Sequence, residues 1–380
     1  MDEVFITDDQ IISPLGFSSE ENVKNLRNEV SGIQEISDPD LAPFSFFGAK
    51  INRENVAEEF NAIGPLSKYT YLEQLMILAI DKLLKKNTET DFSNTLLVVS
   101  TTKGNIDLLK SLGDFPEKRV KLYELARAIQ HFFQFKNEPL VVSNACVSGA
   151  LAVGVAKKML QQKKYKNAIV VAGDLLSEFV LSGFNSFQAL DDKICKPYSK
   201  NRNGINLGEA AAAVLIKKQS TKKNAIKILG EASVNDANHI SGPSRTGEGL
   251  VKSVEKALLE AKISSEKIDF ISAHGTATLF NDEMEAIAFH RLGLSRKPLH
   301  SLKAYYGHTL GASALLETII TKHSLTQNEL YKSLGFSENG VSKALNIIEN
   351  PKKQDLQIAL KTASGFGGCN YAIIFEKKSV

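Results

Sequence analysis

Six short apolar runs, each flanked by turn residues, limit the folds open to this 380-residue chain more than any other feature. They are residues 95–100, 139–145, 168–173, 210–218, 268–275 and 371–377. Their length and their content of Val and Ile predict buried strands. Segments with helical periodicity lie between them, notably residues 61–87 and 249–267. Strands that alternate with helices predict an α/β layered fold with a mixed or parallel sheet.

The composition argues against several classes of protein. Lys and Arg total 46 against 43 Asp and Glu, and a net charge of +3 does not indicate a nucleic-acid partner. The first residues lack an export signal, and no apolar run approaches the roughly 18 residues that span a bilayer. We therefore expect a cytoplasmic protein. Its three cysteines, Cys146, Cys195 and Cys369, are too few and too widely spaced for a disulfide framework or a zinc pair.

Cys146 lies where the run 139–145 gives way to a helical pattern of small residues. This order predicts a strand-to-helix elbow, with the thiol at a helix N-terminus where free N–H groups favour the thiolate. Small residues at 148–150 leave room for close approach of another backbone. The alternative is a buried, inert cysteine.

His274 ends the run 268–275 and is followed by Gly275, Thr276 and Thr278. A histidine just past the carboxyl end of a strand stands where α/β sheets expose their ligand crevice. The two threonine hydroxyls could hold a ligand that carries amides. The alternative for the histidine is a structural hydrogen bond.

Lys303, His308 and Glu317 occupy a segment that is otherwise poor in charge. A buried lysine needs a partner, and Glu317 is the nearest candidate by type. Zinc binding is the competing use of histidine, but neither HExxH nor a Cys/His pair with ligand spacing is present, so no metal site is predicted.

A glycine-rich loop formed by Gly365, Phe366, Gly367 and Gly368 precedes the last apolar run. The alternative reading is a tight turn. Without GK[ST] the loop does not resemble a phosphate cradle, but its N–H groups could act as oxyanion donors. Cys369 follows the loop, either as a second exposed thiol or in a packing role.

Taken in this order, NACVSGA, AHGTAT, LKAYYGHTLGA and GFGG resemble the β-ketoacyl-ACP synthases of type II fatty-acid and polyketide synthesis. The similarity extends to residues 12–33, 197–216 and 236–249. It implies the thiolase-like fold, a five-layer α/β/α/β/α sandwich built from two similar halves. We place the halves at 1–222, with the nucleophile, and 223–380, with the histidines, lysine and glycine loop, because the polar stretch 217–225 reads as a linker.

The resemblance also implies site residues. They are Cys146 as acyl-accepting nucleophile, His274 and His308 as the two histidines of the triad, Lys303 and Glu317 as a supporting pair, Phe366 as the gating residue of a mobile loop that includes Gly365 and Gly367, and Thr276 and Thr278 as holders of the phosphopantetheine arm.

The implied activity is that of an acyltransferase, a decarboxylative Claisen condensation between a cysteine-bound acyl chain and malonyl-ACP. The implied partners are acyl carrier protein and a second subunit, in a homodimer or a heterodimer with a related chain. No cofactor is expected other than the phosphopantetheine that arrives on the carrier.

Three alternatives stay open. A non-catalytic chain-length factor would lose the nucleophile, whereas this chain keeps Cys146. A thiolase would carry a second catalytic cysteine in a different C-terminal motif. Within the synthases, a fatty-acid enzyme competes with a dedicated one, such as an aryl-polyene synthase. The short segment 104–138 before the nucleophile makes the dedicated role plausible.

Overall fold

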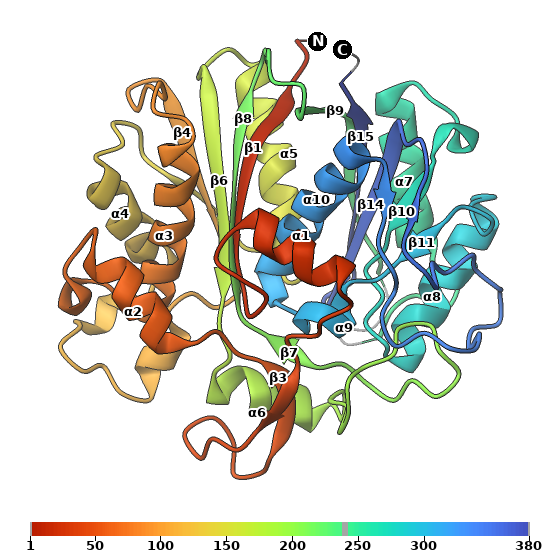
Figure 1. Cartoon of the computed structure of the whole chain (residues 1–380), viewed down its shortest axis with the longest axis horizontal. Helices are drawn as coiled ribbons and strands as arrows, with labels where there is room; N and C mark the ends of the chain where they lie inside the picture. The colour runs from red at the N-terminus through yellow and green to blue at the C-terminus, as the bar shows by residue number, and fades with distance from the viewer. Residues whose placement is uncertain (1, 238–241, 379–380) are drawn as a thin grey trace.

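The predicted apolar runs form central strands in the computed structural model, which describes residues 2–237 and 242–378 (Figure 1). Four runs match strands of similar length: β4 (Thr95–Ser100), β6 (Asn167–Asp174), β8 (Ala210–Lys217) and β15 (Cys369–Lys377). The other two are shorter than predicted, as β5 (Leu140–Val142) and β10 (Phe270–Ser272). β5 is only half-buried, and the prediction of a buried strand was wrong there because β5 lies at the end of the sheet.

The two halves of the chain have the same strand pattern. The N-terminal half runs β5, β4, β6, β8 and β1 (Phe5–Ile12), with two parallel pairings followed by two antiparallel ones. The C-terminal half repeats this with β11 (Leu299–His300), β10, β14 (Ile358–Gly365), β15 and β9 (Ile226–Asn235). The predicted pair of similar halves is therefore confirmed.

The two five-stranded halves share one hydrogen-bonded seam. β1 pairs with β9 through Phe5 opposite Lys227 and Ile6 opposite Ile226, so all ten strands form one sheet. The sequence did not predict this join. The polar stretch 217–225 covers the connection from β8 to β9, and the exact division of the chain at residue 222 stays a prediction. Within the matched segment 236–249, residues 238–241 lie outside the described residues.

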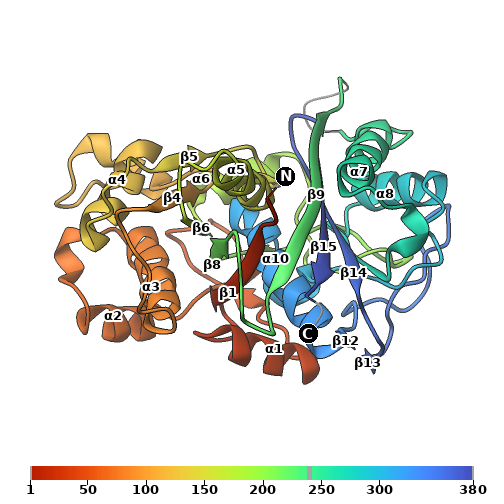
Figure 2. The ribbon, with the colours of Figure 1, turned by 90° about the horizontal axis from the view of Figure 1, so that it is seen from above.

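Helices complete the five layers (Figure 2). α3 (Tyr71–Lys85) packs on the outer face of the N-terminal half, and α7 (Glu248–Ala261) with α8 (Leu279–Arg291) packs on the outer side of the C-terminal half. α5 (Ser148–Gln161) and α10 (Leu310–Gln327) lie side by side between them. The α/β/α/β/α sandwich is confirmed.

The remaining elements surround this framework. The helices are α1 (Ser19–Arg27), α2 (Arg53–Asn61), α4 (Leu122–Phe133), α6 (Glu178–Ser186) and α9 (Lys303–Tyr306), and the short strands are β2 (Gln34–Ile36), β3 (Phe46–Ala49), β7 (Leu207–Gly208), β12 (Glu329–Leu330) and β13 (Lys352–Lys353). In the part of the chain that the structure describes, no helix has the length and apolar character needed to cross a membrane.

Local sequence explains where the layer helices begin and how they pack. α3 starts at a capping box in which Thr70 and Glu73 satisfy each other's backbone N–H groups, so the helix is shorter than the predicted segment 61–87. α10 is buried on every side from Leu310 to Leu325, as a helix enclosed between the two halves of the sheet must be.

The contact between α5 and α10 depends on glycine. A Cβ atom at Gly149 would lie 2.8 Å from the carbonyl oxygen of Gly311 and 2.8 Å from the backbone nitrogen of Leu315. The close backbone approach predicted from the small residues at 148–150 is therefore confirmed. It brings the two helices that lead away from the candidate site into direct contact.

Candidate active site

Cys146 lies on the predicted elbow between β5 and α5. Ala145 has a φ of +45°, which turns the chain sharply before the cysteine. The Ser148 hydroxyl accepts from the N–H of Asn144 at 2.7 Å and donates to the carbonyl of Ala145 at 2.6 Å. This hydrogen-bonded turn places the thiol just before the N-terminus of α5, one of the two central helices.

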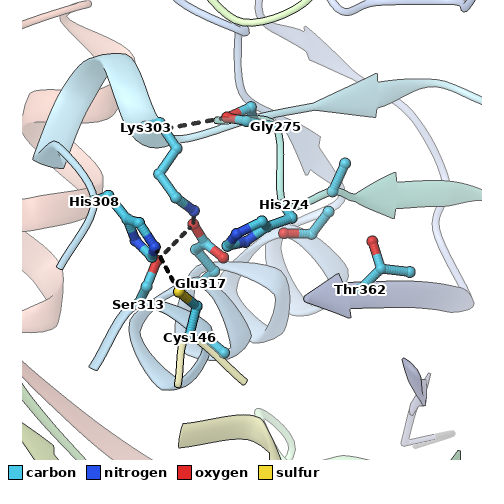
Figure 3. Close-up of polar contacts among 12 residues, drawn as sticks. Cys146, His274, Gly275, Lys303, His308, Ser313, Glu317 and Thr362 are labelled. Atoms are coloured by element: carbon cyan, nitrogen blue, oxygen red, sulfur yellow. Dashed lines mark hydrogen bonds and ion pairs between the residues drawn. The ribbon is translucent and has the colours of Figure 1, made fainter. Parts of the chain in front are cut away.

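Two histidines from the other half of the molecule face this thiol (Figure 3). The Sγ atom of Cys146 is 3.0 Å from Nε2 of His308, and ligand atoms of Cys146, His274 and His308 all lie within 4.8 Å of one another. The two imidazoles meet edge to face, with centroids 5.2 Å apart. The three residues that the resemblance names as a triad therefore lie together in space, and their roles stay predictions.

Burial changes the acidity of the thiol from what the elbow predicted. Cys146 is 8% exposed, and burial, followed by the neighbouring Cys369, raises its pKa to about 12. Lys303 and the backbone N–H of Phe366 oppose this rise without cancelling it. The prediction that the helix N-terminus favours a thiolate was therefore wrong for the resting site. α5 begins two residues beyond the cysteine, and desolvation outweighs the helix end.

Both imidazoles are held neutral. Burial is the main cause and Lys303 the next, lowering the pKa of His308 to about 3 and that of His274 well below its usual range. Their backbones are fixed, because the N–H of His274 donates to Glu285 at 2.9 Å and that of His308 donates to the carbonyl of Asn206 at 2.7 Å. Neither Nδ1 atom has a hydrogen-bond partner among the described residues, so no contact there selects one tautomer.

A buried carboxylate lies between two buried lysines below the histidines. Nζ of Lys303 donates to Oε1 of Glu317, which confirms the predicted pair (Figure 3). The Nζ atom of Lys361 lies 2.7 Å from Oε2 of the same carboxylate. Burial raises the pKa of Glu317, but the two ammonium groups outweigh it and lower that pKa to about 2. Sequence reasoning missed Lys361 entirely.

The glycine loop is a tight turn from Phe366 to Gly368 that also reaches the thiol. Gly367 and Gly368 have φ values of +88° and +81°, which favour glycine. A Cβ atom at Gly365 would lie 3.0 Å from the backbone nitrogen of Cys146, so only glycine permits this approach. The two readings of the loop, a turn and a source of N–H donors near the nucleophile, are compatible.

A cavity of about 340 Å³ opens onto these groups. The hydroxyls of Thr276 and Thr278 lie 2.9 Å apart in its wall. Phe366, 40% exposed, packs at its mouth against Phe184 and Phe187, each with centroids 5.5 Å away. No motif marked these two phenylalanines in the sequence. A larger hollow of about 880 Å³ beside α1 and α2 contains none of the predicted site residues.

The other two cysteines are buried. Cys369 lines the same cavity, and burial raises its pKa to about 11, so it is not the exposed thiol considered from the sequence. Its sulfur lies 3.6 Å from the carbonyl oxygen of Phe366. Cys195 packs away from the cavity, with a pKa raised by burial to about 12.

The thiol and the two imidazoles also form a donor set that zinc would accept. Lys303 and Lys361 both lower the pKa of His308, which means that their charges disfavour added positive charge at this point. The same field opposes a divalent cation. The absence of a metal site stays a prediction.

Two stretches of the chain match known family patterns. Residues 1–222 match the family described as beta-ketoacyl synthase, N-terminal domain, and residues 226–337 match beta-ketoacyl synthase, C-terminal domain. The chain belongs to the beta-ketoacyl synthase family. The family resemblance stated from the four motifs is confirmed.

Sequence and structural relatives match this chain over nearly its whole length. The 3-oxoacyl-(acyl-carrier-protein) synthase 2 of Rhizobium meliloti is 27% identical over 99% of each chain. A beta-ketoacyl synthase structure from Burkholderia phymatum STM815 matches with a TM-score of 0.89, 22% identity and full coverage of both chains. The structure of the ketosynthase ApeO with its chain length factor ApeC from Xenorhabdus doucetiae matches with a TM-score of 0.87 and 22% identity, covering 99% of this chain and 98% of that one. These two structures support the fold.

Proposed function

We propose that this protein is a 3-oxoacyl-ACP synthase, which condenses a cysteine-bound acyl chain with malonyl-ACP. The observation that carries the proposal is the 3.0 Å contact between Sγ of Cys146 and Nε2 of His308, with His274 beside both. A nucleophile in contact with a neutral base, beside a second neutral imidazole, suits acyl transfer followed by stabilisation of an enolate.

In the first half-reaction, the Cys146 sulfur attacks the thioester carbonyl of acyl-ACP while its proton passes to Nε2 of His308. Proton transfer during attack matters because the free thiol has a pKa of about 12 and the imidazole is neutral. The backbone N–H groups of Cys146 and Phe366 stabilise the oxyanion. Collapse breaks the bond to the carrier thiol, which leaves with one proton, and gives an acyl-Cys146 thioester.

In the second half-reaction, malonyl-ACP loses CO2 and the remaining electron pair forms an enolate. Nε2–H groups of His274 and His308 donate to the enolate oxygen. His308, which accepts a proton on Nε2 in the first half-reaction and passes it to the carrier thiol, must therefore change to its Nε2–H tautomer before the second. The carbanion carbon attacks the acyl-Cys146 carbonyl, the C–S bond breaks, and 3-oxoacyl-ACP leaves the cysteine as a thiol after protonation. Removal of one such donor costs about 3–4 kcal/mol in related acyl transfer.

The other predicted residues take supporting roles in this proposal. Lys303 and Glu317 set the electrostatic environment of the histidines. Thr276 and Thr278 present hydroxyls to the amides of the phosphopantetheine arm from the cavity wall. Phe366 covers the cavity mouth, and the glycines on either side of it, Gly365 and Gly367, let the loop move it aside when substrate enters.

We further propose acyl carrier protein as the partner that delivers both substrates, and no cofactor beyond its phosphopantetheine. A second subunit would cover the free edge of β5, where half-buried Leu140, Val141 and Val142 end the sheet. Either a homodimer or a heterodimer with a related chain would cover that edge of β5. The cytoplasmic location stays a prediction.

A chain-length factor is the second candidate, since structural relatives include a ketosynthase with such a partner. The assembled Cys146, His274 and His308 favour the catalytic subunit instead. The choice between a fatty-acid and a polyketide pathway is separate. The genes beside this one would distinguish them, because dehydratases, ketoreductases and an aromatic starter enzyme would indicate the dedicated pathway.

The test is to incubate the protein with acyl-ACP and malonyl-ACP and to follow 3-oxoacyl-ACP by mass spectrometry. Cys146→Ala should abolish the product. Cys146→Gln, which mimics the acylated cysteine, should still decarboxylate malonyl-ACP. Undiminished condensation by Cys146→Ala would remove the nucleophile assignment, and no decarboxylation by Cys146→Gln would argue against the histidine roles.

A further inference from the structure

Lys361 is a fully buried lysine on β14 that the mechanism above does not use. Besides its 2.7 Å ion pair with Oε2 of Glu317, its Nζ donates to three backbone carbonyls: Thr362 at 2.5 Å, Ser272 at 3.3 Å and Ala273 at 3.4 Å. An ammonium group removed from water must be satisfied in this way, or burial costs several kcal/mol.

These contacts join the elements that carry the two halves of the histidine pair. Ser272 and Ala273 immediately precede His274 at the end of β10, which pairs with β14. Glu317 belongs to α10, the helix that begins two residues after His308. One ammonium group therefore ties the backbone before His274 to the helix after His308.

We propose that Lys361 is a positioning residue for the condensation, which fixes His274 relative to Glu317 and adds a second positive charge beneath the histidines. This inference rests on the proposed function. Lys361 does not contact the sulfur or either imidazole through any hydrogen bond among the described residues, so it acts through its neighbours.

Charged side chains from several elements surround His274. Lys303 from α9 and Lys361 from β14 bear positive charge, and Glu317 from α10 bears negative charge. The carboxylate of Glu285 on α8 accepts the backbone N–H of His274. The remaining titratable neighbours, Cys146 and His308, are neutral.

The two lysines and the two carboxylates balance in number, but both lysines and neither carboxylate act on the pKa of His274. Both lysines lower the pKa of His274 and of His308. A neutral imidazole can donate to the enolate without giving up a proton, and a fixed positive charge nearby stabilises the negative charge that decarboxylation creates. Loss of Lys361 should therefore affect decarboxylation more than acylation of Cys146, because the largest influences on the thiol pKa are burial, Cys369 and Lys303.

The test compares Lys361→Met and Lys361→Gln, each in the otherwise natural chain and together with Cys146→Gln. Met removes both charge and donors, whereas Gln keeps two N–H donors for the carbonyls. We expect Lys361→Met to slow malonyl-ACP decarboxylation about 10–100-fold, with acylation of Cys146 within about threefold of the natural rate. The acid limb of the pH profile for decarboxylation by Lys361→Met should shift to higher pH. The reason is that the pKa of His274 rises when a neighbouring positive charge is removed.

Lys361→Gln should show the same pH shift with a smaller loss of the decarboxylation rate. This variant tests the inference if Lys361→Met does not fold. The matched control is Lys157→Met, another buried lysine, which pairs with Glu260, and neither residue lines the cavity. Lys157→Met should lower the stability of the protein without shifting the pH profile of decarboxylation. Unchanged decarboxylation and an unchanged pH profile in both Lys361 variants would overturn the inference, as would equal losses in both half-reactions without a pH shift. An inactive natural chain would instead remove the proposed function.

Discussion

The segments that lead into α5 and α10 occupy equivalent places in the two halves, yet they contribute different chemistry. In each half, the outermost parallel strand, β5 or β11, leads to one of the paired central helices. The segment before α5 carries Cys146 and no charged side chain. The segment before α10 carries Lys303 and His308, and α10 itself adds Glu317.

In the proposed mechanism, this difference divides one reaction between the two halves of a repeated framework. The N-terminal half supplies a nucleophile whose own surroundings raise its pKa, because they bury it without a cation. The C-terminal half supplies the proposed base, His308, together with the buried Lys303, Lys361 and Glu317. Neither half contains all three of Cys146, His274 and His308, so the proposed activity needs the β1–β9 seam and the contact between α5 and α10.

The strongest test of this division separates the two histidines. His308→Ala should slow acylation of Cys146 by about 10²–10⁴-fold, because it removes the base in contact with the thiol. His274→Ala should leave acylation within about tenfold but slow decarboxylation by about 10²–10³-fold. Acylation is measured by mass spectrometry after mixing with acyl-ACP, and decarboxylation from loss of malonyl-ACP.

The control for this experiment is His290→Ala, an exposed histidine on α8, which should change neither rate. Equal losses in both half-reactions for both active-site variants would mean that the two histidines do not divide the work.

A second test concerns the acidity of the thiol. Because only the thiolate reacts and its pKa is raised to about 12, alkylation of Cys146 by iodoacetamide should accelerate about tenfold per pH unit from pH 7 to 10. Lys303→Met should slow it at every pH, since Lys303 lowers that pKa. Peptide mass spectrometry distinguishes Cys146 from the other cysteines. A rate that levels off below pH 9 would show that the helix end governs the thiol after all.

The smallest expected effect probes the contact between the halves. Gly149→Ala should destabilise the protein by about 1–3 kcal/mol, because its Cβ would press against the backbone of α10. The measurement is the midpoint of denaturant unfolding, with the slope unchanged. Gly183→Ala on α6 is the control, since its Cβ meets nothing within 4 Å and should not destabilise. Equal stability of the two variants would refute the tight packing of α5 on α10.

Much of this arrangement was predictable from the sequence because its signals are local. A buried apolar run that ends at His274, or one that passes into a small-residue helix at Cys146, places a side chain at the end of a strand. The turn at residues 366–368 and the pair of Lys303 with Glu317 also follow from residue types near each other in the chain.

The features that escaped prediction depend on tertiary contacts. Lys361 is a single charged residue in a strand, a pattern typical of a solvent-facing position, and its partner Glu317 lies 44 positions away. The pKa of Cys146 is set by burial and by Cys369, which the helix-end argument ignored. The seam between β1 and β9 and the packing of Phe184 on Phe366 carry no local signal either.

The position of β15 has a consequence for how the protein is made. This final strand inserts between β9 and β14, and the turn before it closes over Cys146. The half that carries Cys146 has its own strands complete at Lys217. During synthesis it therefore emerges from the ribosome long before the site can close. During that interval Cys146 lacks the cover that the turn at residues 366–368 provides in the complete fold.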